Sequence, residues 1–214
     1  MNQDGIILGV IIAFELDRKG NDFVVRGSLE LFNRPLIKIT NDLLESLNLY
    51  NKVVYTNQKG IIFKNILDKR VKYIVRKNNY LYTTKSLYKD FKEYLNFITD
   101  ILIVDPKYPF LDDILLKELI DKHKKTNSDI TYIKGAERYN TLVPNVFMIK
   151  KEFFVEVFEK EFSSKQLEIN YLIKLSLFNH ININYIETCY IYKILTVSNG
   201  KVLNSLETLL LNRK

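Results

Sequence analysis

Short β-branched stretches alternate with longer amphipathic stretches along the first 135 residues of this 214-residue chain. The continuous apolar run at residues 6–14 predicts a buried strand. Leucine and isoleucine at helical spacing predict a helix over residues 34–47, with Pro35 in its first turn. The same reasoning predicts strands over residues 52–56, 71–75, 101–104, 130–133, 145–149 and 181–194. It predicts helices over residues 61–67, 84–95, 111–125, 152–160, 166–178 and 202–211.

Strand and helix in strict alternation indicate βαβ units, because parallel neighbouring strands need a crossover connection. The expected fold class is therefore α/β: a three-layer α/β/α single domain, residues 1–214, with a mostly parallel central sheet. Ligands bind such open sheets outside the carboxyl ends of the strands. Candidate chemistry is therefore sought in the loops that follow strands, at residues 15–27, 57–60, 76–83 and 105–109.

Composition and charge bear on the class of protein and on its expected partners. The net charge is +7 and 47% of residues are hydrophobic, so a disordered chain is excluded. No apolar run reaches membrane-spanning length and no secretory signal is recognised, so we expect a cytoplasmic protein without a membrane partner. The lysines are scattered, which favours an anionic small molecule over nucleic acid as partner. The run His123-Lys124-Lys125 is interpreted as a solvated helix end.

Few residues offer other chemistry. The single Cys189 excludes an internal disulfide framework, and with two histidines it cannot form a structural zinc site. We expect Cys189 to be a buried residue of a strand.

Asp105 is the strongest candidate for chemistry. The apolar residues 101–104 deliver it at the end of a predicted strand, where a carboxylate is suited to hold Mg²⁺ against substrate phosphates. The alternative is that Asp105 turns or caps the chain before the following helix, since Asp-Pro commonly opens a turn. Both interpretations remain open on spacing alone.

A basic segment after the first predicted strand is the second candidate. Arg18, Lys19 and Arg26 lie in residues 15–27, where cations would neutralise a bound triphosphate. For Arg18 and Lys19 the alternative is a solvated surface loop. Arg26 follows Val24 and Val25, which predicts an anchored backbone.

Six segments together resemble the sugar-activating nucleotidyltransferases of the glycosyltransferase-A-like fold, and most closely the CMP-sialic acid synthetase-like cytidylyltransferases. The segments are residues 7–13, 26–37 (RGSLELFNRPLI), 51–56 (NKVVYT), 71–81 (VKYIVRKNNYL), 101–111 (ILIVDPKYPFL) and 199–207 (NGKVLNSLE).

The resemblance implies transfer of a nucleoside monophosphate from a nucleoside triphosphate, CTP or UTP, to a phosphorylated or acidic sugar, with release of pyrophosphate. It implies Mg²⁺ as cofactor, a nucleotide-binding half at residues 1–110, an acceptor-side half with a closing helix at residues 111–214, and a homodimer. It assigns catalysis to Arg26 and Asp105, nucleotide binding to Ala13, Arg18, Lys19, Arg76 and Thr83, and the metal to Asp105 and Asn199.

Departures from the family pattern support a second hypothesis, a catalytically degenerate module that binds a nucleotide or a protein. The family's glycine-rich loop retains Gly20 alone, and Arg26 stands where the family has a catalytic lysine. Bulky Tyr80 and Tyr82 occupy the base-recognition segment, where small residues are expected. A glycosyltransferase of the same fold is less favoured, because the chain contains no D-x-D pair.

Overall fold

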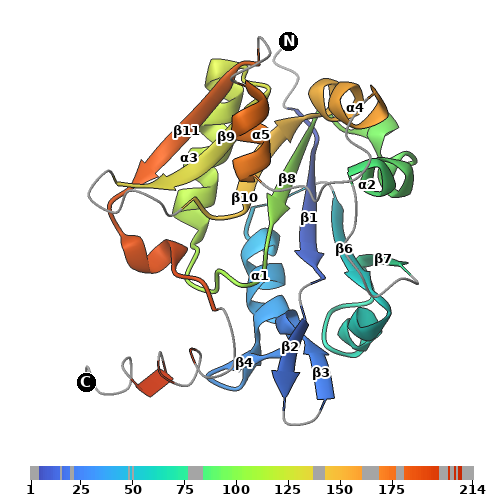
Figure 1. The fold of residues 1–214 in the computed structure, drawn as a ribbon, viewed down its shortest axis with the longest axis vertical. Helices are drawn as coiled ribbons and strands as arrows, with labels where there is room; N and C mark the ends of the chain where they lie inside the picture. Colours follow the sequence, from blue (N-terminus) through green and yellow to red (C-terminus); the bar gives the residue numbers. More distant parts are fainter. Residues whose placement is uncertain are drawn as a thin grey trace.

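A seven-stranded sheet forms the centre of the computed structural model (Figure 1). The structure describes residues 5–14, 16–19, 22–47, 49, 51–76, 84–136, 143–160, 169–176, 181–197, 202, 205, 207 and 208. In spatial order the strands are β11 (Ile183–Thr188), β9 (Ile130–Gly135), β10 (Val146–Lys150), β8 (Asp100–Val104), β1 (Ile7–Ala13), β6 (Asn51–Asn57) and β7 (Lys72–Arg76). Of these strands, β10 alone runs antiparallel to its neighbours.

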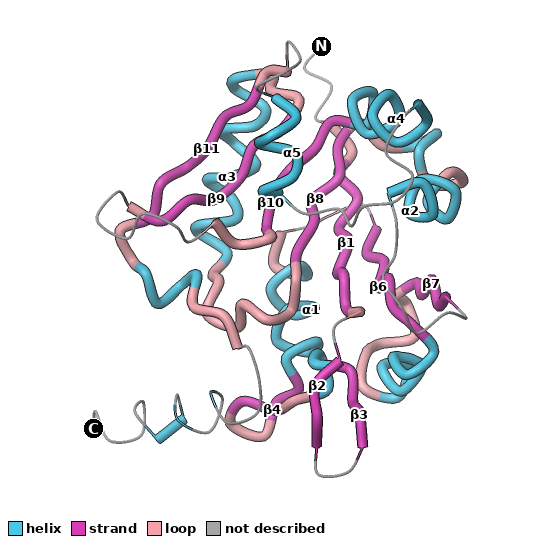
Figure 2. Tube along the Cα trace, in the orientation of Figure 1, coloured by secondary structure: helices cyan, strands magenta, loops and turns pink. Residues whose placement is uncertain are grey.

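Helices cover both faces of the sheet, which confirms the predicted three-layer α/β/α class (Figures 1 and 2). One face packs against α1 (Leu36–Glu45) and α3 (Asp113–Thr126). The other packs against α2 (Thr84–Phe91), α4 (Lys151–Lys160) and α5 (Ile169–Ser176). None of the helices that the structure describes is long and apolar enough to cross a membrane.

The position of β1 inside the sheet explains its continuous apolar sequence. Every residue from Ile7 to Ala13 is buried, and successive side chains point to opposite faces. Leu8 and Val10 join the core under α2, α4 and α5, whereas Ile7 and Ile11 join the core under α1 and α3. A strand that packs on both faces has no polar positions in its sequence.

The ends of α3 follow local capping rules. The Asp112 carboxylate accepts a hydrogen bond from the backbone N–H of Leu115 at 2.9 Å, which starts the helix. Asn127 has a left-handed conformation with φ of 49° and ends it. The helix therefore begins two residues later than the spacing predicts, because the cap lies at Asp112.

Three sequence-based expectations differ from the structure. Residues 15–27 contain a short antiparallel hairpin, β2 (Leu16–Lys19) and β3 (Asp22–Val25), instead of an open loop. The short helix expected over residues 61–67 is a 3₁₀ helix, η2 (Gln58–Asn65), which begins three residues earlier and ends two residues earlier. The last strand ends at Thr188, and a 3₁₀ helix, η5 (Ile191–Ile194), follows it, so Cys189 is exposed outside any strand.

His123 is also misplaced by sequence reasoning, since it is 2% exposed rather than solvated. Its Nε2 lies 3.1 Å from Asp100 Oδ1 and its Nδ1 lies 2.8 Å from Thr131 Oγ1. The last turn of α3 directs His123 onto the sheet, while Lys124 and Lys125 remain exposed. The helix thereby joins the amino-terminal ends of β8 and β9.

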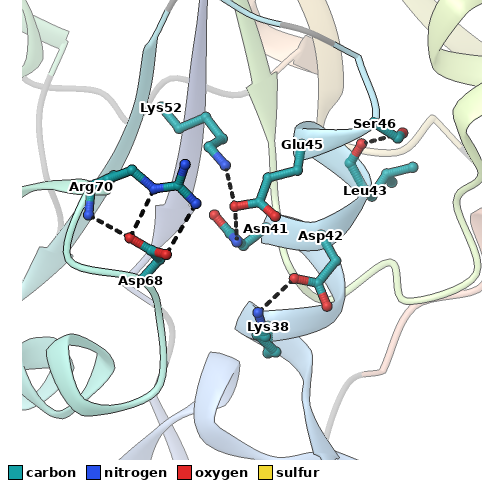
Figure 3. A network of polar contacts seen from close by, with 9 residues as sticks. All are labelled: Lys38, Asn41, Asp42, Leu43, Glu45, Ser46, Lys52, Asp68 and Arg70. Atoms are coloured by element: carbon teal, nitrogen blue, oxygen red, sulfur yellow. Dashed lines mark hydrogen bonds and ion pairs between the residues drawn. The ribbon is translucent and has the colours of Figure 1, made fainter.

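The amino-terminal edge of the sheet carries a different polar network beside the end of α1 (Figure 3). Lys52 Nζ donates to Glu45 Oε1 at 2.6 Å, and Arg70 donates to both carboxylate oxygens of Asp68 at 3.1 Å. A hollow of about 430 Å³ lies here, lined by Leu44, Glu45, Leu49, Asn51, Lys52, Arg70 and Val71. Its cations are already paired with neighbouring carboxylates, so the hollow has no charge to offer a ligand without breaking an ion pair.

Candidate active site

The carboxyl-terminal ends of β1, β6 and β8 lie side by side in the middle of the sheet. After β1 the chain adds β6 and β7 on one side, and then returns to place β8 on the other side of β1. The strand order therefore reverses between β1 and β8, and open α/β sheets bind ligands at such a switch point. Asp105 immediately follows β8 at this position.

Asp105 is buried, with 6% of its surface exposed. Its Oδ1 accepts a hydrogen bond from the backbone N–H of Lys107 at 3.0 Å, and its Oδ2 lies 3.0 Å from Lys107 Nζ. Burial raises the pKa of Asp105, and this effect outweighs the opposing influence of the positive charges on Lys107 and Arg26. Lys107 and Arg26 therefore favour the charged form of the Asp105 carboxylate, while its burial disfavours that form.

The turn interpretation of Asp105 is confirmed in part. The carboxylate bonds to the backbone two residues ahead, as in an Asx turn, and the Tyr108 N–H reaches the Asp105 carbonyl at 3.4 Å. The capping interpretation is wrong, because Asp112 caps α3. Turn formation occupies one carboxylate oxygen with a backbone bond, so the same side chain still presents Oδ2 to a cation.

Arg26 lies close enough to this carboxylate for their charges to interact, and local contacts hold its backbone. It begins the 3₁₀ helix η1 (Arg26–Ser28), where Ser28 Oγ donates to the Val25 carbonyl at 2.8 Å. Gly27 fits closely behind it, since a Cβ atom there would lie 3.0 Å from Phe63 Cζ. The Nε atom of Arg26 is buried, and burial lowers the pKa of this guanidinium while Asp105 and Tyr108 oppose the shift. The prediction of an anchored backbone at Arg26 is confirmed.

Thr56 and Asn57 position the end of β1, and sequence reasoning missed both. Thr56 Oγ1 donates to the Ala13 carbonyl at 2.6 Å, and Asn57 Nδ2 donates to the Phe14 carbonyl at 3.0 Å. Gly60 packs so closely on Thr56 that a Cβ atom would lie 2.0 Å from its Oγ1. Two polar residues ending an apolar strand were the available signal for this role.

The remaining predicted residues lie around the site or beyond it. Ala13 is buried at the end of β1. Arg18 and Lys19 lie in β2 opposite Phe23 and Asp22, toward the tip of the hairpin, which extends past the strand ends in Figure 1. The structure does not describe the side chains of Arg18 and Lys19.

Arg76 ends β7, three strands away from β8, or about 14 Å at the usual strand spacing. Its guanidinium lies 3.2 Å from Asp90 and 3.4 Å from the Tyr55 hydroxyl, so it is tied to α2 and not to Asp105. Thr83 and Asn199 fall outside the described residues. The structure therefore brings Arg26 and Asp105 together, adds Lys107, and leaves Arg76 at a distance.

Known proteins were compared with this chain at the level of sequence and of structure. No family model matches the sequence, and no curated protein matches it. A nucleotidyl transferase from Methanothermobacter thermautotrophicus superimposes with a TM-score of 0.73 at 12% identity, over 98% of this chain and 99% of that one. The chain has the nucleotidyltransferase fold. The 4-diphosphocytidyl-2C-methyl-D-erythritol synthase of Anaerococcus prevotii gives a TM-score of 0.72 at 12% identity, over 96% and 98% of the two chains.

A further structural neighbour is Rv0371c of Mycobacterium tuberculosis, in a crystal structure of its complex with manganese. Its TM-score is 0.63 at 13% identity, over 85% of this chain and 88% of that chain. Identities this low establish a shared architecture. Whether this chain stands closest to the CMP-sialic acid synthetases stays a prediction.

Proposed function

We propose that this protein is a nucleotidyltransferase that transfers a nucleoside monophosphate to a phosphorylated or acidic sugar and releases pyrophosphate. The observation that carries the proposal is the buried Asp105 carboxylate at the switch point of the sheet, within electrostatic range of Arg26. Reactions of this kind depend mainly on positioning and on neutralising charge at the phosphates. Arg26 on η1 and Asp105 after β8 are held for that purpose by elements that pack into the core.

The chemistry of the proposed site divides among its residues. Oxygen of the acceptor attacks the α-phosphorus of the triphosphate, and the bond to the β,γ-pyrophosphate breaks. The Arg26 guanidinium would stabilise the charge that develops on the transferring group. CTP or UTP is the expected donor, with Arg18 and Lys19 as further phosphate contacts and Arg76 and Thr83 toward base or ribose.

Asp105 is the residue in the described chain that would hold Mg²⁺. No group of three or more His, Cys, Asp or Glu residues suited to a metal occurs among the described residues. A single carboxylate still fits Mg²⁺, which is usually bound through one or two carboxylates together with water and substrate phosphates. Bound there, the metal would neutralise part of the charge of the triphosphate. Asn199 is the proposed second ligand.

The proposal is tested with a nucleotide panel. The melting temperature is measured with CTP, UTP, ATP and GTP, each with and without Mg²⁺, and pyrophosphate release is followed with a panel of sugar phosphates and sugar acids. We expect one pyrimidine nucleotide to raise the melting temperature in a Mg²⁺-dependent manner, and Asp105→Ala to abolish that shift. Absence of turnover with every acceptor, in folded protein, contradicts catalysis.

A second candidate, a nucleotide-binding module without catalysis, is favoured by one specific observation. Lys107 engages both oxygens of Asp105, one through its backbone N–H and one through its ammonium group. In that arrangement the carboxylate is neutralised within the chain. A nucleotide that raises the melting temperature equally with and without Mg²⁺, and gives no pyrophosphate, would support this candidate.

A further inference from the structure

The Lys107 ammonium group occupies the position on Asp105 that a divalent cation needs. Its Nζ lies 3.0 Å from Oδ2, and the Lys107 side chain is 18% exposed while that of Asp105 is 9% exposed. The same ammonium lies 5.6 Å from the centre of the Tyr108 ring, within range of a cation–π contact. Lys107 thus covers the carboxylate and has a second contact that holds it there.

We propose that Lys107 is an internal counter-cation that competes with divalent metal for Asp105 and leaves it for the phosphates of the incoming nucleotide. This inference rests on the proposed function. Two cations at one carboxylate oxygen repel each other, so the metal binds Asp105 only after the ammonium moves away. A triphosphate supplies anionic oxygens to receive that ammonium. Metal and triphosphate consequently bind together, and metal alone binds weakly.

The local backbone allows this exchange without unfolding the turn. The Lys107 N–H stays on Asp105 Oδ1, and the Lys107 carbonyl accepts a hydrogen bond from the Val197 N–H at 2.8 Å. Those two bonds fix the main chain, whereas the four-carbon side chain can leave Asp105 by changing its own torsion angles. A substitution that keeps the backbone and removes the ammonium therefore isolates the competing charge.

The experiment measures Mn²⁺ binding without nucleotide, from the electron paramagnetic resonance signal of unbound Mn²⁺. Lys107→Met and Lys107→Gln are compared with the unmodified protein, with Lys107→Arg as the charge-conserving variant. Lys117→Met is the matched control, since it removes one lysine and its ion pair with Asp113 on the exposed face of α3. Circular dichroism and melting curves verify that each variant is folded.

We expect Lys107→Met and Lys107→Gln to bind Mn²⁺ about tenfold more tightly than the unmodified protein, which corresponds to about 1.4 kcal/mol. Lys107→Arg and Lys117→Met should bind as the unmodified protein does. Adding Asp105→Asn to Lys107→Met should remove the gain, because the gain acts through that carboxylate. Equal Mn²⁺ affinity with and without the Lys107 ammonium overturns the inference, as does a gain that survives Asp105→Asn.

The two proposals fail in distinguishable ways. Tighter Mn²⁺ binding by Lys107→Met, with no pyrophosphate release from any nucleotide, would support Lys107 as a counter-cation and contradict the proposed transferase activity. Pyrophosphate release that requires Asp105, together with unchanged Mn²⁺ affinity in Lys107→Met and Lys107→Gln, would retain the transferase and reject the counter-cation.

Discussion

Two buried aspartates stand at opposite ends of the same strand, and their pKa values shift in opposite directions. Asp100 begins β8 and is 8% exposed, whereas Asp105 follows its end and is 6% exposed. Burial alone would raise the pKa of Asp100, but hydrogen bonds from His123 and Thr99 outweigh it and lower the pKa. At Asp105 burial prevails and the pKa rises. Similar solvent exposure alone therefore does not decide the direction of a carboxylate's pKa shift, because Asp105 lies deeper in the fold and the two residues have different polar partners.

The polar partners of the two aspartates also differ. Thr99 Oγ1 donates to Asp100 at 2.7 Å, and His123 lies 3.1 Å away with its other ring nitrogen 2.8 Å from Thr131. His123 and Thr131 are buried whereas Thr99 is exposed, and through His123 this set of bonds joins α3 to β8 and β9. Asp105 has one backbone bond and one lysine, which can exchange. The first arrangement stabilises the fold and the second suits a site that changes partners.

Asp105→Asn gives the largest expected effect and tests the functional end of the strand. Loss of the charge should lower pyrophosphate release by about 10²–10³-fold, the usual result of removing one electrostatic contact in an active site. The melting temperature should stay close to that of the unmodified protein, because the folded state already disfavours this carboxylate charge. Parallel rate and melting measurements check both parts.

The control for Asp105→Asn is Asp113→Asn, at the exposed start of α3, which should change neither quantity much. A severe loss of stability in Asp105→Asn, with activity retained by the folded fraction, would mean that Asp105 serves the turn alone.

Asp100→Asn tests the beginning of β8, where the buried carboxylate is expected to stabilise the fold. Replacing the carboxylate weakens a buried, charge-assisted hydrogen-bond network, and should destabilise the protein by about 1–3 kcal/mol at pH 7. Pyrophosphate release should be unaffected while the protein is folded. Urea unfolding monitored by circular dichroism gives the free energy, and the rate assay gives the second readout.

The direction of the pKa shift of Asp100 determines how the stability loss in Asp100→Asn depends on pH. Because the pKa of Asp100 is lowered from 3.8 on folding, its contribution is present above pH 3.8 and is lost as pH falls through the folded pKa. The stability difference between the unmodified protein and Asp100→Asn should therefore shrink in acid. The pKa of Asp105 is raised on folding, so its charged form destabilises the folded protein. As pH falls and this carboxylate takes up a proton, the unmodified protein should become more stable relative to Asp105→Asn. Parallel trends for the two variants would contradict the comparison.

The sequence alone predicts the parts of this molecule that depend on local pattern. The all-apolar residues 6–14 and 101–104 predict β1 and β8, and the expectation of a carboxylate at the sheet edge follows directly at Asp105. Arg26 is correctly expected on an anchored backbone because apolar residues precede it. Each of these conclusions needs only the alternation of apolar and polar residues and the chain direction.

The rest depends on contacts between distant segments. His123 is buried because the register of α3 on the sheet brings it to Asp100, 23 residues away in sequence, and no local pattern specifies that register. Arg76, expected in the loop after a strand over residues 71–75, ends β7, and its pairing with Asp90 is decided by where α2 packs. The hairpin of β2 and β3 escapes prediction because its polar sequence resembles a loop.

Thr56→Val tests the carboxyl-terminal end of β1, and we expect an effect of intermediate size. The substitution keeps the side-chain volume and removes the bond from Thr56 Oγ1 to the Ala13 carbonyl, so it should destabilise by about 1–2 kcal/mol. Urea unfolding provides the measurement.

Thr40→Val is the matched control for Thr56→Val. Thr40 is equally buried, but its hydroxyl bonds to Leu36, a carbonyl at the i−4 position that the helix itself can satisfy. The control should therefore cost less. Equal losses would show that Thr56 holds the end of β1 no more firmly than a redundant helix bond does.

Arg70→Ala gives the smallest expected effect and concerns a third aspartate. Hydrogen bonds from the Arg70 side chain and backbone lower the pKa of Asp68 to about 2, yet both residues lie in the solvated network of Figure 3. Exposed ion pairs contribute little to stability, so the melting temperature should change by no more than about 2 °C. Proton NMR titration should nevertheless show the pKa of Asp68 rising toward 3.8 as the guanidinium is lost. A large pKa change with little change in stability would show that a shifted carboxylate stabilises the fold only where its main partner is buried with it, as His123 is at Asp100. A drop in melting temperature comparable to that of Asp100→Asn would contradict this distinction.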